Sequence, residues 1–188
     1  MITHLSPMEE VRDFYLLLHP RPAYVIGSGR WGERVNFMAA SWVSPVGEEP
    51  PSLILALGKE SLTLELIEIY GEFTVNIIPI SLIEELYYVG SRSGRDEDKS
   101  KVFKAERGEK VNAPVVKDSL GVLECKLVNE LELGDVKLVL GEVLSAKADK
   151  RFFNERTGWD LKKINIPLHN WGRGFFKVGE FVMAKGKG

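Results

Sequence analysis

The sequence predicts a mainly β protein, an antiparallel Greek-key barrel with short helices at its edges. At 188 residues, the chain is long enough for a single domain, residues 1–188, with a sizeable core. Six or so β-rich segments occur with only three short helical patterns between them. These segments follow one another as hairpins, without the regular alternation of strand and helix that a parallel Rossmann sheet requires.

The N-terminal part is predicted to form a short helix followed by a hairpin. Apolar residues recur at helical spacing over residues 8–18, and Ser6 with Pro7 suits the start of a helix. The prolines of residues 19–22 end it. Two β-rich runs, residues 23–27 and 35–43, flank a turn that contains two glycines, which predicts a hairpin.

The middle of the chain is predicted to alternate loops, strands and two helices. A loop over residues 45–51 leads into a strand over residues 52–57. A helix over residues 62–70 follows, stopped by Gly71. The remaining expectations are a strand over residues 73–78 and a helix over residues 81–89, capped by Ser81 and stopped by Gly90.

The clearest β signal lies in the C-terminal half, where residues 120–133 and 136–146 form two long strands joined at Gly134. Leu123, Cys125 and Leu127 share one face of the first strand, so Cys125 is interpreted as a core residue without a redox role. Residues 152–168 look irregular, and residues 175–183 predict a final edge segment. Asn76 lies in an apolar strand, and we interpret it as a structural residue that needs hydrogen-bond partners.

Composition excludes several classes of function. The net charge is −2, with 25 basic and 27 acidic residues well mixed, so no nucleic-acid surface is expected. No apolar run approaches the roughly 20 residues that span a membrane, and the first ten residues lack a signal-peptide pattern, so we expect a cytoplasmic protein. One cysteine and three scattered histidines predict neither a disulfide nor a metal site. His4 and His19 are interpreted as surface residues.

Residues 35–45, Val-Asn-Phe-Met-Ala-Ala-Ser-Trp-Val-Ser-Pro, stand out because they are small, apolar and hydroxyl-bearing at once. An ordinary core strand would favour bulky β-branched residues. Small residues let a flat molecule approach the backbone, and Asn36, Ser41 and Ser44 add hydrogen-bonding groups. The alternative is a buried strand that another strand crosses closely.

Two later segments could bind a phosphate. Lys59, Ser61 and Thr63 place a cation and two hydroxyls where a strand turns into a helix, at the positive end of the helix dipole. The alternative is that Ser61 is only a helix cap and Lys59 a solvated charge. In Ser93-Gly94-Arg95, the glycine lets the backbone approach a phosphate closely, and the arginine can bind two of its oxygens at once. The alternative is a mobile charged loop. Asp96 and Lys99 would serve only to hold the loop.

In this order, the motifs resemble the flavin reductase-like, FMN-binding split-barrel family. The matching pieces are the N-x-M-x-A-S-W-V-S-P run, the P-P-S-L strand, the T-x-E-L-I helix, the G-E-F-x-V-N strand and the S-G-R-D loop. The resemblance covers residues 20–105 well and the rest loosely. It implies a split barrel that binds FMN near the interface of a homodimer, with residues from both chains at each site.

The resemblance also assigns residues to the cofactor. It implies that the flavin ring lies along Met38, Ala39, Ala40, Ser41 and Trp42, with Asn36 near its edge, although Trp42 could equally be a core residue. It implies that the Ser61 and Thr63 positions hold the phosphate; Lys59, Ser93, Gly94 and Arg95 are candidates for the same role from their residue types. His169, in a His-x-x-Gly sequence, would line the pocket.

The expected activity is an NADH- or NADPH-dependent reductase that transfers a hydride to flavin N5 and passes electrons to free flavin, oxygen, ferric iron or an acceptor protein. No catalytic side chain is expected, because the flavin carries the hydride; nor does the sequence contain a nucleophile elbow or dinucleotide fingerprint. One alternative is an FMN electron carrier that no nicotinamide reduces, and another is a flavin-free β-barrel binding module. Residues 151–171 match the family poorly, and they are where a second substrate would be selected.

Overall fold

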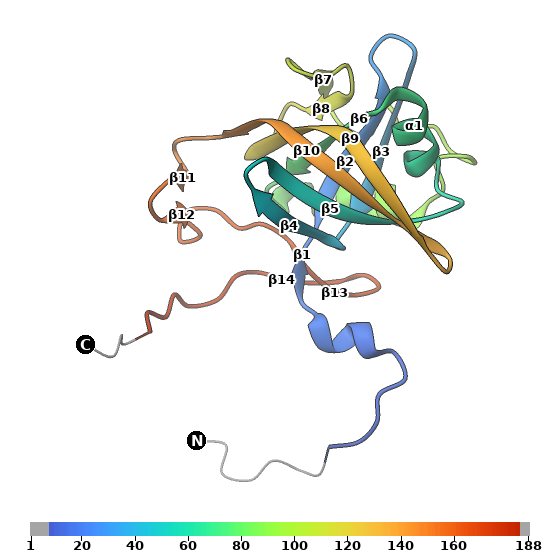
Figure 1. Cartoon of the computed structure of the whole chain (residues 1–188). Helices are drawn as coiled ribbons and strands as arrows, with labels where there is room; N and C mark the ends of the chain where they lie inside the picture. The colour runs from blue at the N-terminus through green and yellow to red at the C-terminus, as the bar shows by residue number, and fades with distance from the viewer. Residues whose placement is uncertain (1–7, 185–188) are drawn as a thin grey trace.

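A single seven-stranded antiparallel sheet dominates the computed structural model, which describes residues 8–184 (Figure 1). The strand order across the sheet is β3-β2-β6-β9-β10-β5-β4. Its strands are β2 (Tyr24–Arg30), β3 (Arg34–Ala40), β4 (Val43–Glu48), β5 (Pro51–Gly58), β6 (Glu72–Ile77), β9 (Gly121–Leu133) and β10 (Val136–Ala148). The sheet curls into an open barrel in which β3 and β4 are the two edges, as the predicted antiparallel split barrel requires.

Three small sheets and four short helices complete the described chain. The small sheets consist of β1 (Arg21–Pro22), β13 (Leu168–Trp171) and β14 (Gly174–Phe176); of β7 (Ala105–Arg107) and β8 (Pro114–Val116); and of β11 (Phe153–Asn154) and β12 (Gly158–Trp159). The helices are η1 (Phe14–Leu18), α1 (Leu62–Tyr70), η2 (Ile80–Leu82) and α2 (Ile83–Ser91). No helix among residues 8–184 is long and apolar enough to cross a membrane.

The predicted long hairpin is confirmed in β9 and β10. Gly134 at its tip has φ 59°, a left-handed conformation that glycine adopts at little cost. The hairpin twists across the front of the barrel in Figure 1. Two register shifts interrupt the pairing, between Leu140 and Gly141 and between Val143 and Ser145. Such bulges bend a strand, and they let this hairpin follow the curvature of the barrel.

Helix α1 forms as its sequence predicts. The Ser61 hydroxyl accepts a hydrogen bond from the Leu64 backbone N–H at 3.2 Å, so Ser61 caps the N-terminus. Gly71 ends the helix with φ 70°. Leu64 and Ile67 face inward and join the barrel core, which anchors the start of the helix against the sheet.

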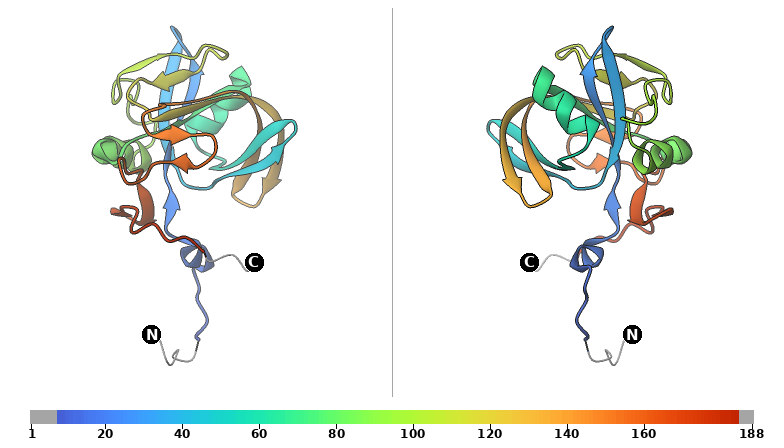
Figure 2. Two further views of the ribbon diagram at one scale, coloured as in Figure 1. Left: turned by 90° about the vertical axis from the view of Figure 1, so that its left-hand side faces the viewer. Right: turned by 90° about the vertical axis from the view of Figure 1, so that its right-hand side faces the viewer.

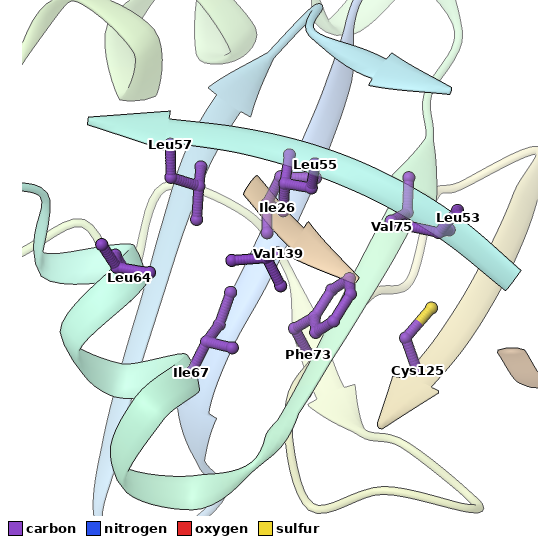
Figure 3. Close-up of a cluster of buried hydrophobic side chains, with 10 residues drawn as sticks. All are labelled: Ile26, Leu53, Leu55, Leu57, Leu64, Ile67, Phe73, Val75, Cys125 and Val139. Carbon is purple, nitrogen blue, oxygen red and sulfur yellow. The ribbon is translucent and has the colours of Figure 1, made fainter. Parts of the chain in front are cut away.

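The barrel core lies between α1 and the inner face of the sheet (Figure 3). Its buried members are Ile26, Leu53, Leu55, Leu57, Leu64, Ile67, Phe73, Val75, Cys125 and Val139. The Cys125 side chain points into this core, as predicted, and burial raises the pKa of its thiol to about 12. At that pKa, the thiol stays protonated and unreactive at neutral pH.

A second core covers the outer face of the β2–β3 hairpin. Its buried members include Val25, Phe37 and Leu86, and it packs α2 against the sheet. Adjacent residues of β2 and β3 therefore face different cores, as strand alternation requires. Asn76 has a structural role here too: its Nδ2 donates to the Val25 carbonyl at 3.0 Å, and its Oδ1 accepts from the Val116 N–H at 2.9 Å.

The N-terminal prediction is largely wrong. Among the described residues of the expected helix, only Phe14–Leu18 is helical, as a 3-10 turn with no buried side chain. Ser6, Pro7 and His4 lie outside the described residues. This segment extends away from the barrel (Figures 1 and 2). Tyr15 contacts Trp42 and Trp171, but Phe14, Leu17 and Leu18 stay exposed, so little tertiary packing stabilises a longer helix.

Further corrections concern strand and helix ends. Residues 45–51 were expected to form a loop, but β4 runs through Pro45 to Glu48, because an edge strand can tolerate a residue without an N–H. Ser81 does not cap a helix, because it lies inside η2, and α2 passes Gly90 to end at Ser91. The expected edge segment over residues 175–183 is reduced to β14, which ends at Phe176.

Glu124 of β9 is a buried carboxylate for which the sequence made no prediction. It lies on the opposite face of the strand from Cys125 and is only 3% exposed. Its Oε2 accepts hydrogen bonds from the backbone N–H groups of Lys110 and Val111, at 2.6 and 3.1 Å. The loop between β7 and β8, two strands that the sequence did not predict, is therefore pinned to the sheet by a buried carboxylate.

Candidate functional site

The candidate site follows β3, the edge strand of the large sheet. Among residues 8–184, β3 pairs only with β2, so its outer backbone groups have no partner strand. One cavity lies near Asn36, at the start of the strand, and another near Ser41, just beyond its end. At about 3.3 Å per residue, these two residues are about 16 Å apart. The predicted ring-binding segment therefore connects two separate cavities.

Asn36 is buried at the first cavity, with 2% of its surface exposed. Its Nδ2 donates to the Thr63 hydroxyl at 2.9 Å and to the Ser28 hydroxyl at 3.3 Å. Its Oδ1 is buried without a hydrogen-bond partner. A Cβ atom at Gly94 would lie 2.5 Å from this oxygen, so only glycine allows the loop to approach. Asn36 thereby links β3, α1 and the Ser93-Gly94-Arg95 loop.

Arg95 extends from this loop to the start of α1. Its Nε donates to the Glu60 carbonyl at 2.9 Å, and its Nη1 lies 2.6 Å from a carboxylate oxygen of Glu65. The Ser93 hydroxyl accepts a hydrogen bond from the Arg95 N–H at 3.1 Å, which fixes the turn. Arg95, a serine hydroxyl and a helix start therefore meet at one place, where the sequence had placed Lys59 as the cation.

Two charged side chains hold the loop in place, which contradicts a freely moving loop. Lys99 is 4% exposed, and its ammonium group donates to the carbonyls of Val89 and Arg92 at 2.9 and 3.0 Å. These bonds satisfy carbonyls at the C-terminal end of α2. Hydrogen bonds from Tyr88, at 2.6 Å, and from Arg92, at 2.6 Å, lower the pKa of the Glu97 carboxyl, which keeps it ionised.

The cavity at this end measures about 270 Å³. It is lined by Arg34, Val35, Asn36, Leu62 and the segment from Gly94 to Lys99. Arg34, which no sequence motif marked, also reaches Glu65 at 3.8 Å. Glu65 thus faces two arginines, and only the folded chain brings Arg34 and Arg95 together.

The three residues predicted at the start of α1 have different environments. Ser61 is half-buried beside the loop and caps the helix through its hydroxyl. Thr63 is 1% exposed, and its hydroxyl is occupied by Asn36, so it supports Asn36 instead of facing the cavity. Lys59 forms an ion pair with Glu132 of the β9–β10 hairpin. This pairing orients the ammonium group toward the hairpin instead of the Arg95 loop.

The cavity at the other end of β3 measures about 390 Å³ and is mostly apolar. Ala39, Ala40 and Ser41 line one side, and His169 and Trp171 of β13 line another. The C-terminal end of α2 also contributes: a Cβ atom at Gly90 would lie 2.8 Å from the Ala39 Cβ. Small residues on both elements therefore allow α2 to pack closely along the strand.

His19 belongs to this end of the site, so the interpretation of it as a surface residue is wrong. Its Nδ1 donates to the Asn170 carbonyl, and this leaves Nε2 free to accept from Arg21 at 2.8 Å. The centres of the His19 and His169 rings lie 5.4 Å apart. Desolvation is the main cause that lowers the pKa of His169, so its imidazole is neutral at pH 7. The sequence could not show this contact, because it joins residues 150 positions apart.

Met38 and Trp42 have different environments, since Met38 packs against the core and Trp42 lies at the surface. Met38 is half-buried and packs against the barrel core. Trp42 is 41% exposed, so a purely core role is excluded. The Arg21 guanidinium lies over its ring, 5.4 Å from the centre, and Tyr15 lies 5.8 Å away, centre to centre. Trp42 thus connects the end of the β3 motif with the N-terminal segment.

These features fit a flavin mononucleotide. The unpartnered Asn36 oxygen and the close approach of Gly94 lie beside the guanidinium groups of Arg34 and Arg95, which suits a phosphate and a ribityl chain. The unpaired edge of β3 offers backbone groups to a heterocycle, and the apolar cavity around Ser41 and His169 suits a ring. Seven predicted residues line the two cavities: Asn36, Gly94 and Arg95 at one end, and Ala39, Ala40, Ser41 and His169 at the other.

Comparisons with known proteins agree with this geometry. The flavin reductase like domain family matches residues 16–179. The uncharacterized protein YddH of Escherichia coli K12 is 35% identical over 180 residues, which cover 93% of this chain and 95% of that protein. A flavoredoxin from Methanosarcina acetivorans has a TM-score of 0.83 at 28% identity, over 96% of this chain and 95% of that chain.

A second flavoredoxin, from Desulfovibrio vulgaris (Miyazaki F), has a TM-score of 0.81 at 28% identity. That similarity covers 94% of this chain and 97% of that chain. The likeness therefore extends over nearly the whole of both proteins, including residues 151–171, which the motif comparison had left loosely matched. The chain belongs to the flavin reductase-like, split-barrel family.

Proposed function

We propose that this chain is an FMN-binding oxidoreductase, in which NADH or NADPH reduces the flavin and the electrons pass to a small acceptor or an acceptor protein. One observation carries the proposal: the unpaired edge strand β3 connects a polar cavity, lined by Asn36, Arg34 and Arg95, to an apolar one. A phosphate-bearing flavin needs both ends. When bound, the flavin would supply hydride and electron transfer at its N5 edge.

The phosphate end would be held by Arg95, Ser93 and the N-terminus of α1 at Ser61. Glu65 balances the charge of Arg95, and Arg34 adds a second cation nearby. A guanidinium binds two phosphate oxygens at once, and the backbone N–H groups at a helix start favour an anion. Lys99 contributes indirectly, since it fixes the loop that carries Ser93 and Arg95.

The ring end would be shaped by Ala39, Ala40, Ser41 and His169. Small side chains on β3 give access to its backbone groups, while His169 and Trp171 keep water from the opposite side. His169 is neutral at pH 7, so it shapes and hydrogen-bonds the pocket without adding a charge. No side chain at either cavity forms a set suited to nucleophilic or general acid–base catalysis.

A second candidate is an FMN electron carrier that nicotinamides do not reduce directly. It is favoured by the similarity to two flavoredoxins over nearly the whole chain. The flavin-free binding module is the third candidate, and it differs from both because it takes up no flavin. Reduction by a nicotinamide separates the first two candidates.

We also propose a homodimer that completes each flavin site. The N-terminal segment leaves large apolar side chains in solvent, with Phe14 66%, Leu17 70% and Leu18 61% exposed. Both terminal segments extend from the same end of the barrel (Figures 1 and 2). A second copy would bury these surfaces beside the Trp42 and His169 end of the site.

Light scattering should give twice the chain mass of 21.1 kDa. Leu17→Asp with Leu18→Asp should shift the protein toward monomer and weaken FMN binding at least threefold, because a charged segment cannot be buried. Ile69→Asp is the matched control: Ile69 is 62% exposed on α1, away from the terminal segments, and its replacement should leave the dimer intact. A wild-type monomer that still holds FMN would contradict the proposal.

The activity is tested by visible spectra of purified protein loaded with FMN under anaerobic conditions. We expect a bound flavin that NADH or NADPH bleaches within seconds, which would also identify the donor. Bleaching by dithionite alone would reject the reductase in favour of the electron carrier. Failure to take up FMN would leave only the binding module.

The phosphate end is tested by charge reversal at the two predicted cations. Arg95→Glu should weaken FMN binding at least tenfold, which corresponds to about 1.4 kcal/mol, because a charge-assisted hydrogen bond is lost. Lys59→Glu makes the same charge change at a residue that pairs with Glu132, so its effect should be smaller. Riboflavin, which lacks the phosphate, should bind wild type and Arg95→Glu equally. Unchanged FMN affinity in Arg95→Glu would remove the phosphate from this end.

A further inference from the structure

A third cavity, of about 1230 Å³, lies at the mouth of the barrel and is not used by the proposed flavin site. Its apolar wall includes Tyr24, Leu53, Val75, Leu123 and Val143, all of which belong to the large sheet. This volume lies just above the range of about 300–1,000 Å³ that small-ligand sites commonly occupy. Leu53 and Val75 are buried members of the barrel core, and Tyr24, Leu123 and Val143 are partly buried against it.

The mouth cavity shares no lining residue with either flavin cavity. Along β2, Ala23 precedes the strand and lines the cavity beside His169, whereas Tyr24 lines the mouth cavity. After β3, Ser41 lines the cavity beside His169 and Val43 lines the mouth cavity. Different residues therefore line the two regions, and a ligand in one need not displace a ligand in the other.

The wall of the cavity is built from ordered elements. The β11–β12 hairpin folds over one side, where the Phe153 and Trp159 rings pack edge to face, 5.0 Å apart. Trp159 lies against Gly121, at which a Cβ atom would approach the indole within 3.1 Å. Bulges between Pro45 and Gly47 of β4 and between Val143 and Ser145 of β10 border the same opening. Bulges of this kind commonly adjoin binding sites.

The rim of the cavity has an excess of positive charge. Lys150 and Arg156 line it, and neither forms an ion pair with any residue that the structure describes. Lys147 is already paired with Glu109. The single acidic residue of the lining is Glu155. An apolar interior, with two cations at its rim that form no ion pair with a described residue, is complementary to an apolar molecule that bears one negative charge.

We propose that the mouth of the barrel is a second small-molecule site, which takes a flat apolar organic anion such as an aromatic carboxylate or sulfonate. The apolar body would lie against Leu53, Val143 and Trp159. The anionic group would face Lys150 and Arg156. The site lies within one chain and needs no flavin, so its existence does not depend on the proposed oxidoreductase activity.

Two probes with the same aromatic body test the proposal on the full chain, with and without saturating FMN. Calorimetry measures the affinity of the protein for 8-anilinonaphthalene-1-sulfonate, and fluorescence measures its affinity for the uncharged N-phenyl-1-naphthylamine. We expect one sulfonate probe per chain, bound at least tenfold more tightly than the uncharged probe and equally well with FMN present. Equal affinities of the two probes, no binding, or loss of binding when FMN is added would overturn the proposal.

Variants locate the probe. Lys150→Glu with Arg156→Glu should weaken the sulfonate at least tenfold and change the uncharged probe by less than threefold; both residues are exposed, so folding should be unaffected. Lys104→Glu, an exposed residue outside the cavity, is the matched control and should change neither. Val143→Trp should fill the cavity and exclude both probes. Sulfonate binding that survives the double charge reversal, or a Val143→Trp protein that loses its dimer, would contradict a ligand site here.

Discussion

The unpaired edge of β3 is the constraint on which the rest of the structure depends. Closing the barrel would satisfy the backbone groups of both edge strands, yet β3 and β4 stay apart. Exposed edges invite pairing with other chains, and proteins commonly cover them. Here, α2 and the loop after it run along β3, and glycines at positions 90 and 94 allow contact with Ala39 and Asn36. These two elements thus flank β3, while its edge stays unpaired between the two cavities.

Apolar packing holds α2 against the sheet, whereas buried polar groups hold the loop after it. The Lys99 ammonium loses hydration when it is buried, which lowers its pKa, and its two carbonyl acceptors at the end of α2 offset this cost. Glu97 connects Tyr88 of α2 with Arg92 just beyond it. The loop that presents Arg95 is therefore ordered before any ligand binds, so little entropy need be lost on binding.

The sequence predicted those parts of the fold that local signals determine. Hairpin β9–β10 and helix α1 were predicted because a glycine at the turn, a serine cap and clear periodicity act within a few residues. The N-terminal helix failed because periodicity cannot reveal that a segment leaves the body of the protein. The burial of Glu124 could not be predicted, because it depends on Lys110 and Val111, which come from a distant loop.

In the candidate site, too, local motifs could be predicted and long-range contacts could not. Asn36, Ser41 and Arg95 were found because each lies in a recognisable motif, and the fold places all three beside the two cavities of β3. His19, Arg21 and Arg34 were missed because their contacts join positions far apart in the chain, and nothing in their local sequence marks them. Lys59 has the expected residue type, but its ion pair with Glu132 depends on where the tip of the β9–β10 hairpin lies.

The central claim is that a flavin lies along the free edge of β3, with its phosphate at Arg95 and its ring toward Ser41 and His169. A crystal structure of the FMN-loaded protein tests it most directly. We predict density for the phosphate within hydrogen-bond distance of Arg95 and for the ring against the β3 backbone. Flavin density at the mouth of the barrel, near Leu53 and Trp159, or at neither end of β3, would contradict the account.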